Sequence, residues 1–566
     1  MQLSSFLKSS IMLWSIFPWM LSMTIYLFYM NFYIMLEWNI MITNSMNISF
    51  PLIIDPWGCL FSSTVMFISA NVMHFSHLYM YNDKYHSRFN NLILMFVLSM
   101  NCLIFIPNMI CMLLGWDGLG ITSFILVIYY QNSKALAAGM ITVLMNRIGD
   151  TMIIISIAIM MNYGNWNINS LWETNWNMML IMLILIAAIT KSAQMPFSSW
   201  LPAAMAAPTP VSALVHSSTL VTAGVFILFR FHYILYTNQT INSLLIIISS
   251  ITMLMASLTA ISECDMKKII ALSTLSQLSI MMLSLSMNLP YLTFFHLITH
   301  ALFKALLFLM AGSMIHYHHH SQDLRFMGNT MNSSPNSISM LLIANLALCG
   351  SPFLSGFYSK DLILEMSMFN TTNFMILMLF LISTLLTSCY TMRLLLSVLW
   401  NSSNSLSYQY LNDKSYMFLY PSMMLSMGAI MGGSMLNWLS FNYLNEPILP
   451  MMQKMIPLII MFMGFYLAFN YTNTPLTYFK SFPFIHKYMF SMWFLEPLMS
   501  QGNILKPLMM SHINYKIMDN GWLEQFGSQF LFKIFKKNSH IINLMTSKPM
   551  NYYLMFSLIS MFLIFI

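Results

Sequence analysis

Eight ionisable side chains of this 566-residue chain stand within or at the ends of long apolar stretches. A charge at the centre of a bilayer costs about 2.5–3.5 kcal/mol or more, so a membrane helix keeps one only with a partner or a function. The carboxylates, amines and imidazoles found here are groups that exchange protons. They are Asp117, Lys191, His216, His296, His300, Lys304, Lys360 and Asp361. Their types predict a path for protons or cations through a membrane.

Three of these residues, His296, His300 and Lys304, are spaced by four in LTFFHLITHALFKALLFLMAG. Each step of four residues turns a helix by about 40° and climbs about 6 Å, so the three side chains form one polar stripe. Histidine takes and gives protons near neutral pH, and an amine removed from water can also give up its proton. A metal site would need further ligands beyond the HxxxH pair.

Two of the lysines lie where an apolar run is interrupted. Lys191 ends one such run, and Lys360 with Asp361 follows a second interruption. Transporters place ion sites at pairs of broken helices in corresponding halves of the chain. The alternatives are a Lys191 that reaches the membrane surface from a helix end and a Lys360–Asp361 pair at a loop edge. The interrupting residues are Pro196, Pro202, Pro208 and Pro210 in the first case and Gly350, Pro352 and Gly356 in the second.

Asp117 and His216 stand in contrasting surroundings. Glycines flank Asp117 in GWDGLG and let another helix approach closely. Hydroxyl side chains surround His216, which serves either proton transfer or helix packing.

Arg147 and Asp150 are spaced for a pair on one helix face, with a structural or a relay role. Lys267 and its neighbours are expected at a helix start on the surface.

The composition places the chain in a membrane. Hydrophobic residues make up 58% and charged residues 7%, whereas soluble domains are about one quarter charged. The apolar runs are too long for the alternating strands of a β-barrel. We therefore predict an all-α polytopic protein with about 15–16 transmembrane helices. The net charge is +7, and the basic residues form no continuous basic face, which excludes a nucleic-acid role. The six cysteines show no CxxC spacing for an iron–sulfur or zinc site.

Polarity divides the chain into five parts. We expect N-terminal transmembrane helices in 1–108, a translocation core in 109–400, further transmembrane helices in 401–508, an amphipathic helix in 509–548 and a membrane anchor in 549–566. The amphipathic helix follows from apolar residues at helical spacing opposite polar ones. The apolar set is Leu523, Phe526, Phe530 and Ile534, and the polar set is Gln529, Lys533 and Lys537.

Several motifs in fixed order resemble the chain-5 family of NADH:ubiquinone oxidoreductase, respiratory complex I, over roughly residues 55–395. They are GWDGLG at 115–120, NRIGD at 146–150, KSAQMPFSSWLP at 191–202, PTPVSALVHSSTLVTAGV at 208–225, DMKKIIALSTLSQL at 265–278, HLITHALFKALLF at 296–308 and GFYSKD at 356–361. The spellings GWDGLG and PAAMAAPTP look arthropod-like. The tail is compatible with the family's lateral amphipathic helix and last anchor.

This resemblance implies two inverted five-helix repeats, each with a broken helix, around a central polar axis. It implies that Asp117 pairs with Lys191, that the His216, His296, His300 and Lys304 positions connect across the middle, and that Lys360 and Asp361 stand toward the distal exit. Many members carry Glu at the Asp117 position. Because Asp is one methylene shorter, the distance within the pair is expected to differ.

The resemblance also implies a proton-translocating core subunit whose redox chemistry takes place elsewhere. FMN, iron–sulfur clusters and ubiquinone would be bound by other subunits, with no cofactor or metal in this chain. Partners would be other membrane subunits, including an antiporter-like neighbour along the lateral helix, and lipids. The 62 methionines suggest an animal mitochondrial code and hence the mitochondrial inner membrane. The alternatives are a subunit of a standalone cation/proton antiporter and a structural scaffold.

Overall fold

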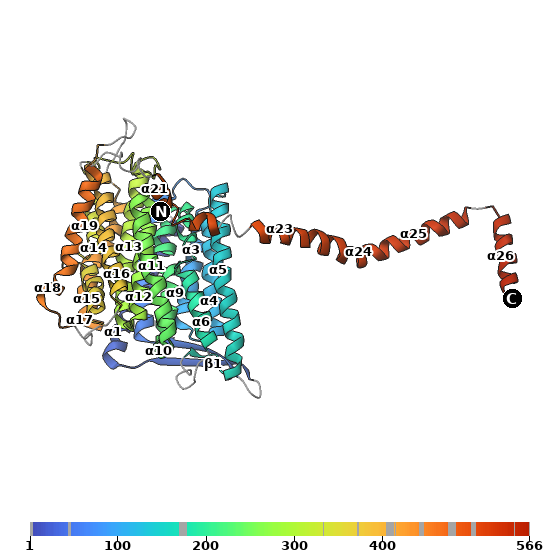
Figure 1. Cartoon of the computed structure of the whole chain (residues 1–566), viewed down its shortest axis with the longest axis horizontal. Coiled ribbons are helices and arrows are strands. Elements are labelled where there is room, and N and C mark those ends of the chain that lie inside the picture. Colours follow the sequence, from blue (N-terminus) through green and yellow to red (C-terminus); the bar gives the residue numbers. More distant parts are fainter. Residues whose placement is uncertain are drawn as a thin grey trace. The chain divides into compact units, whose positions relative to one another are not determined.

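The computed structural model describes residues 4–42, 47–168, 178–331, 333–370, 373–402, 413, 415–440, 447–473, 483–499, 505–547 and 549–564. The chain forms two compact units, Met1–Leu495 and Glu496–Ile566. The first unit is a bundle of long helices that run roughly parallel to one another (Figure 1). The predicted division into five parts stays a prediction, and pieces of its 401–508 part lie outside the described residues.

Ten helical segments of the first unit are long and apolar enough to cross a bilayer. They comprise α1 (Ser5–Met30), α2 (Pro56–Tyr79), α3 (His86–Phe105), α4 (Met109–Val127), α5 (Ser133–Met160) with η1 (Met161–Tyr163), α8 (Thr209–Val211) with η4 (Ser212–Thr219) and α9 (Leu220–Arg230), α11 (Gln239–Ser262), α12 (Met266–Ser286), α13 (Pro290–Tyr317), and α16 (Phe374–Leu395) with η6 (Leu396–Trp400). The polytopic helical fold is therefore confirmed.

Shorter helices complete the first unit. They are α6 (Met178–Lys191), α7 (Trp200–Ala203), η3 (Ala204–Ala206), α10 (His232–Thr237), α14 (Pro335–Cys349), η5 (Phe357–Asp361), α15 (Leu362–Phe369), α18 (Met451–Lys454), α19 (Ile456–Asn473), α21 (Pro483–Phe490) and α22 (Leu495–Pro497), the last of which crosses into the second unit. One further long helix, α17 (Tyr416–Ser440), packs against α2, α13 and α14. Among the described residues ten segments qualify as membrane spans, and the count of 15–16 transmembrane helices stays a prediction.

A β-hairpin that was not predicted crosses one end of the bundle (Figure 1). Strands β1 (Ile34–Ile42) and β2 (Asn47–Ile54) pair in antiparallel register, with Trp38 opposite Phe50. A cross-strand aromatic pair of this kind stabilises a hairpin. Asn108, which precedes α4, donates a hydrogen bond of 2.8 Å from its side chain to the Ser49 carbonyl and ties the hairpin to the helices.

The two predicted helix interruptions are present, after α6 and after α14. The chain before α6 pairs with Asn108 through Asn167, so α6 enters from the hairpin end. Asp413, which precedes α17, accepts hydrogen bonds from the first amides of α14, and α14 enters from the opposite end (Figure 1). Broken helices that enter from opposite ends are the arrangement that an inverted repeat requires.

The second break depends on a glycine. Gly350 ends α14 with φ of +86°, a left-handed conformation that side-chain-bearing residues rarely adopt. A Cβ at this position would also come within 2.7 Å of the Asp361 carboxylate. The glycine therefore permits both the turn and the close seat of Asp361.

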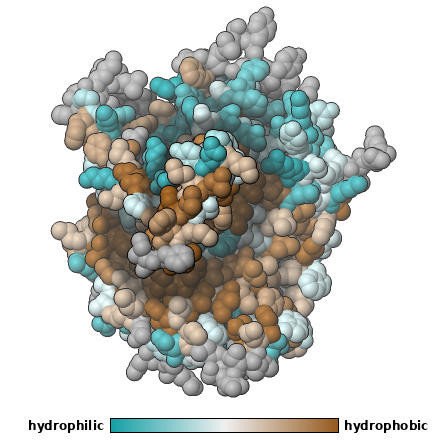
Figure 2. Space-filling view, turned by 90° about the vertical axis from the view of Figure 1, so that its right-hand side faces the viewer, coloured by the Kyte–Doolittle hydropathy of each residue, from teal (hydrophilic) through white to brown (hydrophobic). Residues whose placement is uncertain are grey.

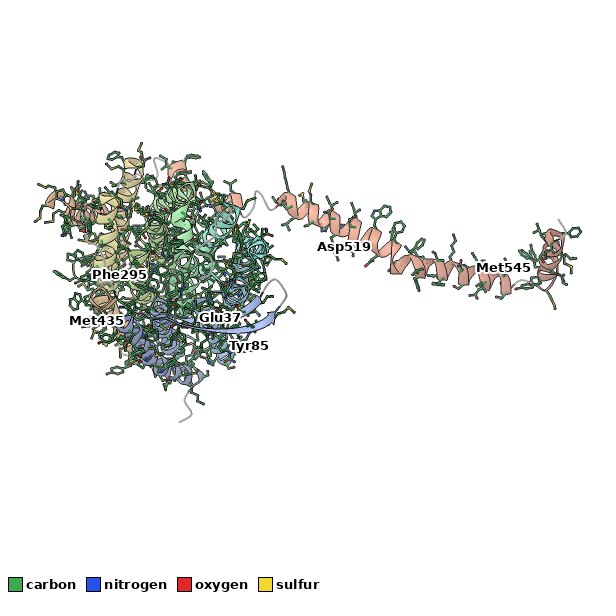
Figure 3. The ribbon with its side chains drawn as sticks, turned by 90° about the horizontal axis from the view of Figure 1, so that it is seen from below. Glu37, Tyr85, Phe295, Met435, Asp519 and Met545 are labelled. Atoms are coloured by element: carbon green, nitrogen blue, oxygen red, sulfur yellow. The ribbon has the colours of Figure 1, made fainter. Side chains whose placement is uncertain are left out.

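The second unit is a series of helices followed by a short apolar helix. Segments α23 (Leu505–Asn514), η8 (Tyr515–Leu523), α24 (Glu524–Phe526) and α25 (Ser528–Thr546) precede α26 (Asn551–Ile564). Side chains project from all sides of these helices in Figure 3. Gly527 lies outside helical geometry between α24 and α25, so the predicted amphipathic helix is divided there.

Hydrophobic residues cover the middle of the face seen in Figure 2, and hydrophilic residues gather toward its upper edge. Exposed apolar side chains in the middle of α3 to α5, such as Met95, Leu114 and Ile154, agree with a bundle whose outer surface contacts lipid. The polar residues of the predicted site lie in the interior instead, except Asp117, whose side chain is 35% exposed.

We expect Gly115→Ala to lower the stability of the full-length chain. A Cβ at Gly115 would lie 2.6 Å from the backbone nitrogen of Leu103 on α3, and overpacking of this kind costs about 1–3 kcal/mol. The midpoint of thermal unfolding in detergent measures the effect. Leu114→Ala, at a neighbouring exposed position, is the control. Equal midpoints for the two variants would contradict the close approach of α3 and α4.

Candidate functional site

The polar stripe of α13 is buried along its whole length. His296, His300 and Lys304 have no exposed surface. The rings of His296 and His300 lie 6.2 Å apart between centroids. His296 contacts the hydroxyl of Ser359 at 3.0 Å through Nδ1 and the side-chain oxygen of Gln277 at 3.2 Å through Nε2. The predicted stripe is thus held from α12 on one side and from the second broken helix on the other.

Lys304 and Lys360 are both held by neutral oxygen atoms. The Lys304 ammonium donates to the hydroxyl of Ser273 on α12. The Lys360 ammonium donates to the Thr387 hydroxyl on α16 at 3.0 Å and to the Leu348 carbonyl at 3.3 Å. That carbonyl is at the end of α14, where the interrupted helix leaves backbone oxygens without helical partners.

Ser359 joins the stripe to the second break. The Ser359 hydroxyl lies 3.0 Å from both His296 Nδ1 and the Thr299 hydroxyl. In the sequence, Ser359 directly precedes Lys360. Residues 357–361 form the π-helical turn η5, which places Ser359, Lys360 and Asp361 in the interior. Such π turns often occur at functional sites because they re-aim side chains. Lys360 and Asp361 therefore do not form a pair at a loop edge.

Lys191, at the end of α6, is fully buried and does not reach the surface. Its ammonium donates to the backbone carbonyl of Trp116 at 3.0 Å and lies 4.5 Å from the centre of the Trp116 ring. A cation over the face of an indole is attracted by the ring quadrupole. Lys191 is thus bound to α4 through the residue that precedes Asp117.

The expected direct pair of Asp117 and Lys191 is not formed among the described residues. The nearest cation to the Asp117 carboxylate is Arg147, at 3.9 Å. The other Asp117 oxygen is buried without a hydrogen-bond partner in the described chain. A short aspartate on α4 reaches Arg147 but not the ammonium that Trp116 holds, in keeping with the missing methylene noted above.

Asp150 is a second carboxylate at this end of the site. It forms an ion pair with Arg147 at 3.3 Å and accepts a hydrogen bond of 2.8 Å from the Trp116 indole. Trp116 joins Asp150 to Lys191, because its indole donates to Asp150 and its carbonyl accepts from the Lys191 ammonium. The pair predicted for Arg147 and Asp150 is present, and Arg147 extends it to Asp117.

His216 lies in the π-helical segment η4, which packs against α13. Its ring is 6.3 Å from that of Trp200, whose indole donates a hydrogen bond to the Thr190 carbonyl. Trp200 therefore stands between His216 and the residue that precedes Lys191. Neither ring nitrogen of His216, nor of His300, has a hydrogen-bond partner among the described residues.

Several residues of the site were not predicted from the sequence. Each lies beside a predicted residue in space and bears no charge, so the cost of burying a charge in a membrane does not identify it. They are Trp116, Trp200, Ser273, Gln277, Ser359 and Thr387. Their signal was a polar side chain within an apolar helix, which is too common in this chain to single them out.

The helix start expected at Lys267 is present, but the expected surface position of this residue is wrong. The residue is buried, and its ammonium donates to the Ala207 carbonyl at 3.2 Å. It lies on the first turn of α12, where one face of the helix is covered by the chain between η3 and α8. Position at a helix start did not show which face Lys267 occupies.

No group of three or more possible metal ligands occurs among the described residues. His296 and His300 thus have no third ligand there.

Comparisons with known proteins agree on one family. Three family models match: NADH-Ubiquinone oxidoreductase (complex I), chain 5 N-terminus, at residues 38–90; NADH:quinone oxidoreductase/Mrp antiporter, TM, at 106–387; and NADH dehydrogenase subunit 5 C-terminus at 390–566. NADH-ubiquinone oxidoreductase chain 5 of Lumbricus terrestris is 48% identical over 98% of this chain and 97% of its own length. That of Aedes aegypti is 46% identical over 94% of each chain. The chain belongs to the NADH-ubiquinone oxidoreductase chain 5 family.

A solved structure of an Mrp complex from Dietzia sp. DQ12-45-1b shares the fold of this chain-5 protein. The TM-score is 0.76 at 20% identity, with 96% of this chain covered. The chain spans 61% of the length of that protein. At this identity the likeness concerns the fold alone, and it agrees with the antiporter-like architecture expected from the sequence.

We predict that Trp116 and Asp150 are energetically coupled. Trp116→Phe removes the indole donor, and losing a hydrogen bond to a charged group costs about 1.5–3 kcal/mol. A double-mutant cycle with Asp150→Asn, measured by unfolding of the full-length chain, should give non-additive losses. Trp166→Phe is the control, because that indole donates to the Ile157 carbonyl instead. Losses that add for Trp116 within about 0.3–0.5 kcal/mol would contradict the contact.

Proposed function

We propose that this chain moves protons through the membrane arm of respiratory complex I along its buried Asp, Lys and His residues. Its family membership makes it a membrane subunit of NADH:ubiquinone oxidoreductase. The observation that carries the relay is the set of three buried lysines, Lys191, Lys304 and Lys360, each bound by oxygens of another helix. An enclosed amine of this kind is costly to keep unless it has a function.

The contacts support a relay in two stretches. In the first, Thr190 and Trp200 connect the Lys191 region to His216. In the second, the His300 and His296 rings lead to Ser359 and so to Lys360. Lys304 stands one turn beyond His300 on the same face of α13. Protons would pass between these groups directly or through water, which serves buried polar atoms that protein groups leave unbound.

The charge cluster at Lys191 is suited to gating. Asp117 contacts Arg147 and directly follows Trp116, which binds Lys191, and one of its carboxylate oxygens has no hydrogen-bond partner in the described chain. A shift of Asp117 toward Arg147 weakens its attraction for the Lys191 charge, and a shift back strengthens it. Energy from elsewhere in the complex would act by moving this carboxylate. Asp150 would hold Trp116 in place during the exchange.

Electron transfer would take place in other subunits. We found no motif for a flavin, a quinone or a cluster in the sequence, and FMN, iron–sulfur clusters and ubiquinone are assigned to partner chains. The proposed partners are the other membrane subunits, with an antiporter-like neighbour along α23 to α25. The proposed location is the mitochondrial inner membrane, in keeping with the multi-pass helices.

A standalone cation/proton antiporter would use a similar core. The match of residues 390–566 to the C-terminal model of NADH dehydrogenase subunit 5 favours complex I, because it covers the tail as well as the core. Cation exchange by the isolated chain in vesicles would favour the antiporter.

Replacing Lys191, Lys304 or Lys360 by Met, or by Ala, in the assembled complex should lower the number of protons pumped per electron. The amine is removed while the rest of the site is retained. Proton uptake and NADH oxidation, measured together in sealed vesicles, give this ratio. Lys454→Met, at an exposed residue of α18, is the matched control.

Undiminished pumping per electron in all three lysine variants would refute the relay. Loss of assembly with normal pumping per assembled complex would support the scaffold alternative instead. The amount of assembled complex, measured by native electrophoresis, separates these outcomes.

A double-mutant cycle of Asp117→Asn and Lys191→Met tests the proposed gate. If Asp117 acts through Lys191, the second substitution should add little to the loss of pumping caused by the first, with a coupling of about 0.5–3 kcal/mol. Pumping rate at fixed NADH oxidation is the measurement. Independent, additive losses would show that Asp117 serves Arg147 alone.

A further inference from the structure

A deep groove on the side of the bundle lies apart from the polar axis. It has a volume of about 1610 Å3 and is walled by α1 and α17, with α2 and α13 at its floor. Pockets for small ligands measure about 300–1,000 Å3, so this groove is larger than a typical small-molecule site. The mechanism proposed above uses none of its residues.

The groove opens to the lipid-facing surface. Its rim carries exposed apolar side chains such as Tyr29 on α1 and Met427 and Met435 on α17. Met435 lies at the edge of the bundle in Figure 3. The floor is formed by residues such as Leu60 on α2 and Leu302 on α13, which are buried. The occupant must therefore present an apolar body toward the helices.

The groove has one polar end. Asp55 and Arg230 line it there and form a bidentate ion pair with N–O distances of 2.7 and 2.8 Å. Asn31 and Tyr33 lie at the same end, beside the start of the hairpin. Trp57 also lines this end, and Trp and Tyr prefer the level of lipid headgroups.

The ion pair presents charges of both signs. Arg230 donates to both Asp55 oxygens and, at 3.5 Å, to the Ile104 carbonyl; it keeps further guanidinium donors, and each Asp55 oxygen keeps a lone pair. A headgroup with a phosphate and an amine complements this pair, whereas a purely anionic headgroup would meet the carboxylate. The charge pattern favours a zwitterionic partner.

The depth of the groove matches a lipid rather than a transmembrane helix. On α2 it runs from Pro56 to Phe67, about 18 Å of helix, and on α17 from Met424 to Leu439, about 24 Å. A helix that crosses the whole bilayer, headgroup regions included, spans about 40–45 Å, whereas one lipid with its headgroup takes up one leaflet, about half of that thickness. The walls would leave much of a helix uncovered.

We propose that this groove binds one zwitterionic phospholipid of the surrounding bilayer, with its acyl chains along α1 and α17 and its headgroup at Asp55 and Arg230. The lipid completes the packing between the two walls. This site does not depend on the proton relay, so each can fail without the other.

Native mass spectrometry of the purified full-length chain tests the site. The chain is reconstituted with equal amounts of phosphatidylcholine and phosphatidylglycerol and washed in detergent, and the masses of the protein and its lipid adducts are measured. The wild-type protein should retain a phosphatidylcholine adduct. Met427→Trp and Met431→Trp, which fill the groove, should lose it. Met423→Trp and Ile430→Trp on the same helix, outside the groove, should retain it.

A second measurement does not depend on bulky substitutions. Phosphatidylcholine with brominated acyl chains quenches nearby tryptophans, and Trp14 and Trp57 line the groove. Quenching that survives the detergent wash should decrease in Trp14→Phe and Trp57→Phe but not in Trp438→Phe, an exposed residue outside the groove.

Three results would overturn the proposal. They are equal adducts in filling and control variants, retention of phosphatidylglycerol in preference to phosphatidylcholine, and a helix of another subunit seated in the groove in a map of the assembled complex. Loss of the adduct only in the filling variants, with unchanged thermal unfolding, supports it.

Discussion

Three buried lysine ammonium groups must be held by oxygen atoms that the helices themselves supply. Lys191 is bound by a carbonyl, Lys304 by a hydroxyl, and Lys360 by one of each. Neutral oxygens stabilise a charge less than a carboxylate would, and they also leave it free to change. The interior is built around this balance, because a permanent ion pair at each lysine would fix the proton where it is.

The irregular parts of the helices provide this balance. An interrupted helix exposes carbonyl groups that a continuous helix would use internally, and Lys360 uses that of Leu348. The π-helical segments η4 and η5 carry His216 and Lys360 respectively. Because the breaks enter from opposite ends of the bundle, the two irregular regions meet the regular helix α13 in the interior. Regular helices alone would supply neither the carbonyls nor the side-chain directions.

Much of this arrangement follows from the sequence, because charge is rare in a membrane chain. The cost of burial singled out Lys191 and the α13 stripe, and proline and glycine marked both breaks. The rest depends on three-dimensional contacts. Trp116 and Ser359 bear no charge. Residue spacing along the chain cannot show that Trp116 contacts Lys191, or that Ser359 contacts His296, because each contact joins different helices. The hairpin was missed because its apolar strands resemble the neighbouring helices in composition. Asp117 was given the wrong nearest partner because side-chain reach is not visible in a motif.

The hydrogen bond from the Lys191 ammonium is accepted by the main-chain carbonyl of Trp116, and this affects which substitutions evolution can tolerate at position 116. Every amino acid carries a carbonyl, so no single substitution at position 116 deletes that bond. Natural variants can alter the indole and its hold on Asp150 while the lysine keeps its anchor. Conservation of the side chain at position 116 among related sequences would then report only the role of the indole, and would not reveal that the backbone carbonyl binds Lys191. The bond is encoded by the path of α4, and only changes that shift that helix can remove it.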